Sequence, residues 1–295
     1  MKRTRGRSSS AGAGDRGGVQ SVTVAARILN ALAKAGGRVA LKTLATETGL
    51  ARAKVHRYLR SLRTAGLVSQ QPDTSLYQLG PQAIAIGLAA LRGVNPVAEV
   101  CNALPALRDD INQTVTAAVW SEAGPILVAM QESDHWLTMN IRIGSRLPVL
   151  STAIGRIFLA YLPEADVAAL VAAEQKTALA HGTELPSPDE MRDLTAEIRR
   201  RRLVRVPSPL VPGIDALAAP VFDFTNKLVA VVCVVARSEA KITGWSGSAV
   251  RALTETAAEI SARLGFVDGG APSNAKDQTK TEPNDAPGLS LPSRN

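Results

Sequence analysis

The segment that most constrains the fold is residues 51–65, ARAKVHRYLRSLRTA. At about 100° per residue, a helix over this segment places Val55, Leu59 and Leu62 on one side, with Tyr58 beside them. The other side and its flanks carry no acidic residue and consist of Arg52, Ala53, Lys54, His56, Arg57, Arg60 and Ser61. A helix that packs by one face and is basic on the other suits the phosphate-lined major groove of DNA. An isolated basic helix is more often merely solvated, so its neighbours decide the interpretation.

Two segments before this helix predict a helix-turn-helix. Residues 21–35 have apolar residues at helical spacing, Ser21 is a candidate N-cap, and two glycines follow. Residues 41–48 form a second short helical segment, which Gly49 ends in a tight turn. Two short helices joined by a glycine-containing turn, the second of them basic, are the helix-turn-helix arrangement.

A hairpin is predicted after the basic helix. Residues 67–69 and 76–79 read as short strands, and the turn-forming residues 72–74 lie between them. The hairpin carries no acidic residue except Asp73 near its tip, so it suits a neighbouring groove or the backbone of DNA. A helix-turn-helix followed by a hairpin is the winged variant, and the combination strongly favours DNA binding.

Charge is divided unequally along the chain. Residues 1–80 contain 14 Lys and Arg against three Asp and Glu, a net charge of +11, whereas residues 81–295 contain 20 against 23, a net charge of −3; together they give the formal +8 of the chain. This division indicates a nucleic-acid-binding module attached to a second domain. Residues 1–18 are either a basic arm that contacts the DNA backbone or simply a disordered tail.

Composition argues against several other classes of protein. Hydrophobic residues make up 45% of the 295 residues, enough for a sizeable core. No run of about 18 apolar residues predicts a membrane helix, and no apolar segment follows the basic N-terminus as in a secretory signal. Cys101 and Cys233 lie far apart in segments expected to be buried, which suits small core residues in a reducing cytoplasm. A cytoplasmic protein without a membrane partner is therefore expected.

The second part of the chain is predicted to have an α+β fold. Helices are expected over 97–111, 151–162, 163–173, 188–202 and 246–264, and strands over 114–120, 126–131, 137–143, 204–206, 215–222 and 228–236, with a turn at 122–125. Antiparallel strands with flanking helices form an α+β sheet domain.

Signs of catalysis or metal binding are missing from the sequence. His56, His135 and His181 fall in separate segments, and none has a second ligand at metal spacing. The HExxH, GxSxG and P-loop patterns of metalloproteases, hydrolases and nucleotide-binding proteins do not occur. Asp109 and Asp110 are adjacent on a helix and face different ways, so they do not form a carboxylate pair. We therefore expect no enzyme, no cofactor and no metal site.

An ordered set of motifs resembles the IclR family of bacterial transcriptional regulators. In the N-terminal part these are SVTVAARILNAL, LKTLATETGL, VHRYLRSLRTAGL and, at the exit from the wing, YQLGP. In the second part, RIGSRLPVLSTAIGRIFLAYLP resembles the loop and helix beside that family's effector pocket, and PGIDALAAPVFDFTNKLVAVVCVVARS resembles its last strand pair. The resemblance covers roughly residues 21–266.

The resemblance implies a transcriptional regulator with a winged helix-turn-helix and a GAF-like effector domain. It also implies a homodimer, or a dimer of dimers, on double-stranded operator DNA. The helix over 83–91 would join the domains and support the dimer, or else be a plain linker packed on its own chain. The expected boundaries are a disordered basic tail at 1–18, the DNA-binding domain at 19–80, a linker helix at 81–96, the effector-binding domain at 97–267 and a disordered tail at 268–295.

The resemblance further implies a pocket for a small metabolite, often an organic or aromatic acid, between the sheet and the loop and helix. Matched by motif, its residues would be Gly144, Leu147, Thr152, Ala153, Gly155, Asp215, Ala216, Leu217, Cys233 and Val235. From the residues themselves, Ser151 and Thr152 open a helix whose free N–H groups attract a carboxylate, although both are also ordinary N-cap residues.

Departures from the family pattern fall on both predicted sites. Ala216 stands where the family usually has Cys, and Cys233 and Val235 stand where it has small hydroxyl residues, which favours a more apolar ligand or none. In the basic helix, Ala53 and Lys54 replace the usual polar pair, so one hydroxyl contact to the DNA backbone is lost and a positive charge is gained.

A DNA-binding regulator is the leading interpretation of the sequence. Arg57 lies nearest the centre of the outward face of the basic helix and is the first candidate for a base contact or a close phosphate contact. The alternative is a small-molecule sensor whose helix-turn-helix docks a protein partner. Salt dependence separates the two, because binding to several phosphates weakens steeply with salt.

Overall fold

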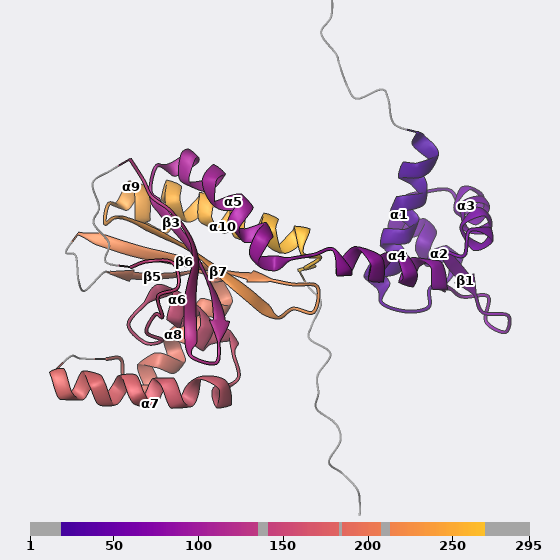
Figure 1. The fold of residues 1–295 in the computed structure, drawn as a ribbon. Helices are drawn as coiled ribbons and strands as arrows, with labels where there is room; N and C mark the ends of the chain where they lie inside the picture. The colour runs from indigo at the N-terminus through magenta and orange to yellow at the C-terminus, as the bar shows by residue number, and fades with distance from the viewer. Residues whose placement is uncertain (1–18, 135–140, 183–184, 208–212, 269–295) are drawn as a thin grey trace, which may run out of the picture. The chain divides into compact units, whose positions relative to one another are not determined.

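The computed structural model describes residues 19–134, 141–182, 185–207 and 213–268. The chain forms two compact units, Met1–Val94 and Asn95–Asn295, whose helices and strands are labelled in Figure 1. Among the described residues, no single helix is both long enough and apolar enough to cross a membrane. Helices Pro81–Arg92 and Pro96–Ile111 meet these two criteria only when they are counted together as one bent pair.

The first unit is a helix-turn-helix followed by a hairpin and one more helix. Its elements are α1 (Gln20–Ala35), α2 (Leu41–Thr48), α3 (Arg52–Thr64), β1 (Val68–Gln70), β2 (Tyr77–Leu79) and α4 (Pro81–Arg92). The core between them consists of Val24, Ile28, Leu32, Val39, Leu44, Ala45, Val55, Leu59, Leu62, Val68 and Tyr77. Strands β1 and β2 pair antiparallel, with Ser69 opposite Gln78. The predicted winged helix-turn-helix is confirmed.

Glycines shape the turns of this unit. Gly36 ends α1 at φ 64° and Gly49 ends α2 at φ 63°, in left-handed backbone that strains any residue with a side chain. Gly80 faces a different constraint, because a Cβ atom at this position would lie 2.2 Å from the carbonyl oxygen of Gly66. The chain can therefore pass from the wing into α4 only by a close backbone approach, after which Pro81 occupies the first position of α4.

The first residues of three elements differ from the expectation. Helix α1 begins at Gln20, and its N-cap is Val19, which offers no side-chain hydrogen bond. Ser21 is thus inside the helix and does not cap it. Strands β1 and β2 begin at Val68 and Tyr77, one residue later than expected, which leaves the hairpin and its turn in place.

The second unit is a five-stranded antiparallel sheet with helices on both faces (Figure 1). Its strands are β3 (Thr114–Ser121), β4 (Gly124–Gln131), β5 (Val204–Pro207), β6 (Ile214–Phe222) and β7 (Leu228–Arg237), in the spatial order β4-β3-β7-β6-β5. Its helices are α5 (Pro96–Ile111), α6 (Ala153–Tyr161), α7 (Glu164–His181), α8 (Pro188–Arg201), α9 (Ala240–Thr243) and α10 (Ser248–Arg263). The predicted α+β architecture is confirmed.

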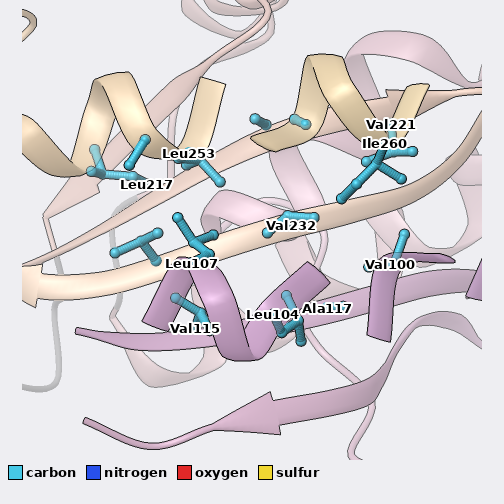
Figure 2. Packing of buried hydrophobic residues seen from close by; sticks show 14 of the residues in the cluster. Val100, Leu104, Leu107, Val115, Ala117, Leu217, Val221, Val232, Leu253 and Ile260 are labelled. Carbon is cyan, nitrogen blue, oxygen red and sulfur yellow. The ribbon is translucent and has the colours of Figure 1, made fainter. Parts of the chain in front are cut away.

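One face of the sheet packs against α5 and α10. The buried side chains that meet there are Val100, Leu104 and Leu107 of α5, Leu253 and Ile260 of α10, and Val115, Ala117, Leu217, Val221 and Val232 of the strands (Figure 2). Full burial of a Leu, Ile or Val side chain contributes roughly 1.5–3 kcal/mol. Burial of these side chains therefore stabilises the second unit, and apolar side chains fill this face of the sheet.

The other face of the sheet packs against α6 and α8. Alternation along each strand sends every second side chain to this face. The cluster contains Ala118, Leu127, Leu147, Ala153, Ile154, Ile157, Phe158, Ala160, Ile198, Val204, Val206, Ala218, Val231 and Cys233. Helix α7 buries only Val167 along its whole length, so it is a peripheral helix.

Several boundaries in the second unit correct the expectation. The turn expected at 122–125 is shorter, because Gly124 already belongs to β4. Helix α7 continues to His181 instead of ending at residue 173. The short helix α9 was not expected. Of the strand expected at 137–143, residues 137–140 lie outside the described residues. Residues 141–143 are described and are not in a strand.

Candidate nucleic-acid interface and effector site

Helix α3 is held by one face and presents the other. Val55 and Leu59 are fully buried, and Leu62 is 6% exposed. The predicted DNA-facing residues comprise Arg52, Ala53, His56, Arg57, Arg60 and Ser61, which are exposed, and Lys54, which is half-buried. The structure thus brings the seven residues together on one helix, because the apolar spacing that the sequence displays is the face that packs.

The positive charge of α3 has no acidic partner among the described residues. Within the described part of the chain, no basic side chain of α3 forms an ion pair. At its end, Arg63 donates to Gln70 Oε1 on β1 at 2.6 Å, and Arg38 donates to Gln78 Oε1 on β2 at 3.2 Å. Sequence reasoning missed these two arginines because Arg63 lies at the end of α3 and Arg38 lies before α2, yet both contact a strand of the wing.

The first turn of α3 leaves backbone donors open. Its N-cap, Ala51, has no capping side chain, and the Ala51 carbonyl oxygen accepts from the N–H groups of Lys54 and Val55 at 2.9 and 3.0 Å. Within the described residues, the N–H groups of Arg52 and Ala53 make no hydrogen bond. A helix start with free N–H groups is a ready site for a phosphate oxygen.

In the second unit, part of the predicted effector set shares the face of the sheet that packs against α6. Leu147, Ala153 and Cys233 belong to the buried cluster on this face, and Ala216 and Val235 pack against it. Most of these side chains are apolar, and they come from two strands, from α6 and from the loop before it.

Asp215 and Leu217 lie on the opposite face, which corrects their inclusion in the effector set. Leu217 is in the cluster beneath α5 and α10. Asp215 is 1% exposed, and its Oδ2 accepts from Arg205 at 2.8 Å and from the hydroxyl groups of Ser238 at 3.0 Å and Thr243 at 2.6 Å. Because strand neighbours alternate, residues 215 and 217 cannot share a face with residue 216. Asp215 is therefore the buried partner of an ion pair with Arg205, whose side chain is partly exposed.

Three of the loop and helix-start residues of the predicted set have structural roles. Thr152 caps α6, since its Oγ1 accepts from the N–H of Gly155 at 2.9 Å and donates to the Pro148 carbonyl at 2.7 Å. Gly155 must be glycine, because a Cβ atom there would lie 2.2 Å from the oxygen of Pro148. Gly144 turns the chain at φ 89°, and its N–H donates to Leu127.

Ser151 does not cap α6, contrary to its expected place at the helix start. Its N–H and its hydroxyl both donate to the carboxylate of Glu174, at 3.0 and 2.8 Å. An anion of the protein itself, the Glu174 carboxylate, is therefore bound by the loop just before the helix start. The helix itself keeps two open donors: within the described residues, the N–H groups of Ala153 and Ile154 make no hydrogen bond.

Cys233 and Thr116 form the polar part of the α6 face. They are direct partners on strands β7 and β3. Burial raises the pKa of the Cys233 thiol to about 12, an effect that a hydrogen bond with Thr116 partly opposes. The thiol is therefore neutral near pH 7, and Thr116 is a buried hydroxyl that sequence reasoning missed because it reads as an ordinary strand residue.

A metal centre finds no support in the described residues, which contain no group of three or more His, Cys, Asp or Glu able to hold an ion. His56 is exposed on α3, and His181 is exposed at the end of α7. His135 lies outside the described residues.

Comparison with known proteins matches both units. Residues 21–72 match the IclR helix-turn-helix domain, and residues 89–262 match the bacterial transcriptional regulator IclR C-terminal family. The transcriptional repressor IclR of Escherichia coli (strain K12) is 31% identical over 209 residues, which are 70% of this chain and 76% of that protein. The acetate operon repressor of Salmonella typhimurium (strain LT2) is 29% identical over 209 residues, with the same shares of each chain.

A solved structure extends the similarity to the fold of nearly the whole chain. The crystal structure of Pseudomonas aeruginosa HmgR is 35% identical and matches with a TM-score of 0.75, over 85% of this chain and 100% of that one. The C-terminal family match alone spans more than half of the 295 residues. Its relatives are transcriptional regulators, a family without enzymatic activity. The chain belongs to the IclR family of bacterial transcriptional regulators.

Proposed function

We propose that this regulator reads double-stranded operator DNA with α3 lying in the major groove. The observation that carries the proposal is an exposed helix face with several cations that form no ion pair with any of the described residues. The contacting residues would be Arg52, Ala53, Lys54, His56, Arg57, Arg60 and Ser61. The open N–H groups of Arg52 and Ala53 would hold a phosphate, and Arg57 would reach a base or an adjacent phosphate.

The test removes the Arg57 side chain. A duplex is first selected from a random pool by the wild-type protein, and its affinity is then measured for Arg57→Ala. A bidentate contact of Arg to guanine contributes about 1–3 kcal/mol, so the dissociation constant should rise roughly 5- to 150-fold. Arg251→Ala removes the same charge from an exposed position on α10 and should change the affinity less than twofold. Equal affinities of Arg57→Ala and the wild type would rule out this role for Arg57.

We also propose that a small organic or aromatic acid binds on the α6 face of the sheet. The open N–H groups of Ala153 and Ile154, at the positive end of a nine-residue helix, support a carboxylate there. The apolar side chains around them support an apolar body on the acid. The retained contact residues are Gly144, Leu147, Thr152, Ala153, Gly155, Ala216, Cys233 and Val235.

The effector proposal is tested by a thermal-shift screen of short-chain and aromatic acids, each beside its uncharged amide. An acid should raise the melting temperature and its amide should not. Ala153→Pro removes one N–H at the first helical position, where proline is tolerated after the extended backbone of Thr152 (φ −110°, ψ 151°). This variant should lose the response, whereas Ser248→Pro, at the first position of α10, should keep it. An undiminished shift in Ala153→Pro contradicts the assignment.

The proposal also covers the oligomeric state, the domain boundaries and the cellular location. We propose a homodimer, or a dimer of dimers, with α4 in the contact, because this apolar helix buries no side chain in its own chain. We retain the boundaries 19–80 for the DNA-binding domain, 81–96 for the linker and 97–267 for the effector domain, with tails at 1–18 and 268–295. A regulator that binds the bacterial chromosome would work in the cytoplasm.

A further inference from the structure

The carboxylate of Glu174 occupies a cradle of backbone donors in the loop before α6. Its Oε2 accepts from the N–H groups of Val149 at 2.7 Å and Leu150 at 2.9 Å. Its Oε1 accepts from the N–H of Ser151 at 3.0 Å and from the Ser151 hydroxyl at 2.8 Å. Three successive N–H groups and a hydroxyl converging on one carboxylate form an anion-binding site, and this chain fills the site itself.

The opposite side of the same loop is held by α6. Arg156 Nε donates to the carbonyl oxygen of Leu150 at 2.7 Å. Burial lowers the pKa of the Arg156 guanidinium, an effect that the nearby Glu174 carboxylate partly opposes. The loop therefore has its N–H groups fixed by an anion on α7 and a carbonyl group fixed by a cation on α6.

Helix α7 buries few side chains. Val167 is its one buried residue among those described, and Glu174 lies about two turns further along. A hollow of about 270 Å³ adjoins the carboxylate and is lined by Leu147, Pro148, Leu170 and Glu174 among others. Space therefore remains beside the cradle, and the attachment of α7 to the loop depends on the carboxylate contacts.

We infer that Glu174 is the positioning residue of the effector site, an internal anion that fixes the loop at 149–151 and so places the start of α6. By filling the cradle, it leaves an external acid only the N–H groups of Ala153 and Ile154. The claim about the external acid rests on the effector site proposed above, whereas the claim that Glu174 fills the cradle is independent of that site.

The experiment empties the cradle and offers it a free carboxylate. Hydrogen–deuterium exchange is measured on the full-length protein for the peptide that covers residues 148–152, with sodium formate or with sodium chloride at the same ionic strength. In Glu174→Ala this peptide should exchange about tenfold faster than in the wild type, and the melting temperature should fall by roughly 5 °C. Formate should restore much of the protection and chloride should not.

Controls separate positioning from a general loss of stability. The wild type should show no formate response in this peptide, and Gln175→Ala, an exposed neighbour on α7, should behave as the wild type. Unchanged exchange in Glu174→Ala overturns the inference. The inference is also overturned if formate protects the peptide in Glu174→Ala no better than chloride does, because an anion cradle must accept a small carboxylate.

A second variant covers the case in which Glu174→Ala does not fold. Glu174→Gln keeps one accepting oxygen, but its amide nitrogen cannot accept, so at least one loop donor loses its partner. Exchange of the 148–152 peptide should then be intermediate, and protection equal to that of the wild type overturns the inference. If no acid binds the wild type, the proposed effector site fails, whereas the exchange experiment still decides the role of Glu174.

Discussion

The arginines at 199–202 and the arginines of α3 differ in whether the protein provides them with partners. The run at 199–202 is the densest basic segment, yet its side chains are bound within the protein. Arg201 pairs with Glu197 at 2.6 Å and lies 4.2 Å from the ring centroid of Trp245, and Arg202 pairs with Asp268 at 2.6 Å. The arginines of α3 have no such counter-charge within the described residues. Unneutralised charge, rather than a high density of basic residues, distinguishes the proposed nucleic-acid surface.

The buried Cys233 thiol leads to a prediction about pH. Its pKa is raised from 9.0 to about 12, so the folded state holds the thiol proton over a range in which the unfolded chain releases it. The stabilising contribution is complete below about pH 9 and is lost as the pH rises from about 9 to about 12. Iodoacetamide at pH 8 should therefore leave Cys233 unmodified in folded Cys101→Ser, as measured by intact mass.

Unfolding supplies the control for this prediction. The same Cys101→Ser protein in denaturant should take up one label, because its remaining thiol is then exposed and has its ordinary pKa. Rapid labelling of the folded protein at pH 8 would show that the thiol is neither buried nor neutral.

The elements show which predictions the sequence supports and which need the fold. Helices α1, α2 and α3 were predictable because each has one apolar face at helical spacing and a glycine near its end. The misplacement of Asp215 and Leu217 was avoidable, because the two-residue period of a strand already sets both against Ala216. The role of Glu174 was not predictable: it lies 23 to 25 residues from its partners, and an acidic residue on a helix normally reads as solvated.

Helix α4 gives the prediction at the scale of an element. Ile84 and Leu88 lie four residues apart on one side of it and are 62% and 52% exposed. Large apolar side chains in such a row indicate a contact with another chain. The double variant Ile84→Glu with Leu88→Glu should shift the mass measured by light scattering toward the 30.9 kDa of one chain.

The matched control for α4 replaces an exposed leucine of another helix by glutamate. Leu179 on α7 is 85% exposed, and Leu179→Glu should leave the oligomer intact. A wild-type protein that is already monomeric, or a double variant with the wild-type mass, contradicts the proposed contact.

At the scale of the whole molecule, two units with different charge and different cores are joined in one chain. The basic first part can bind DNA through unspecific attraction to phosphates as well as through base contacts. The second unit contributes a sheet with a buried apolar cluster on each face, and next to one of these faces the start of α6 has two N–H groups that make no hydrogen bond among the described residues. A regulator needs both properties, and the family to which the chain belongs combines the same two domains.

The salt dependence of DNA binding by the wild-type protein tests the central claim most directly. The dissociation constant for the selected duplex is measured from about 50 to about 200 mM salt, beside Arg57→Ala and Arg251→Ala. For six or more phosphate contacts, affinity should fall roughly a thousandfold or more over this range. The Arg57→Ala protein should bind more weakly at every salt concentration, and Arg251→Ala should follow the wild type. Binding that is insensitive to salt, or unaffected by Arg57→Ala, would contradict the account of α3 as the DNA-reading helix.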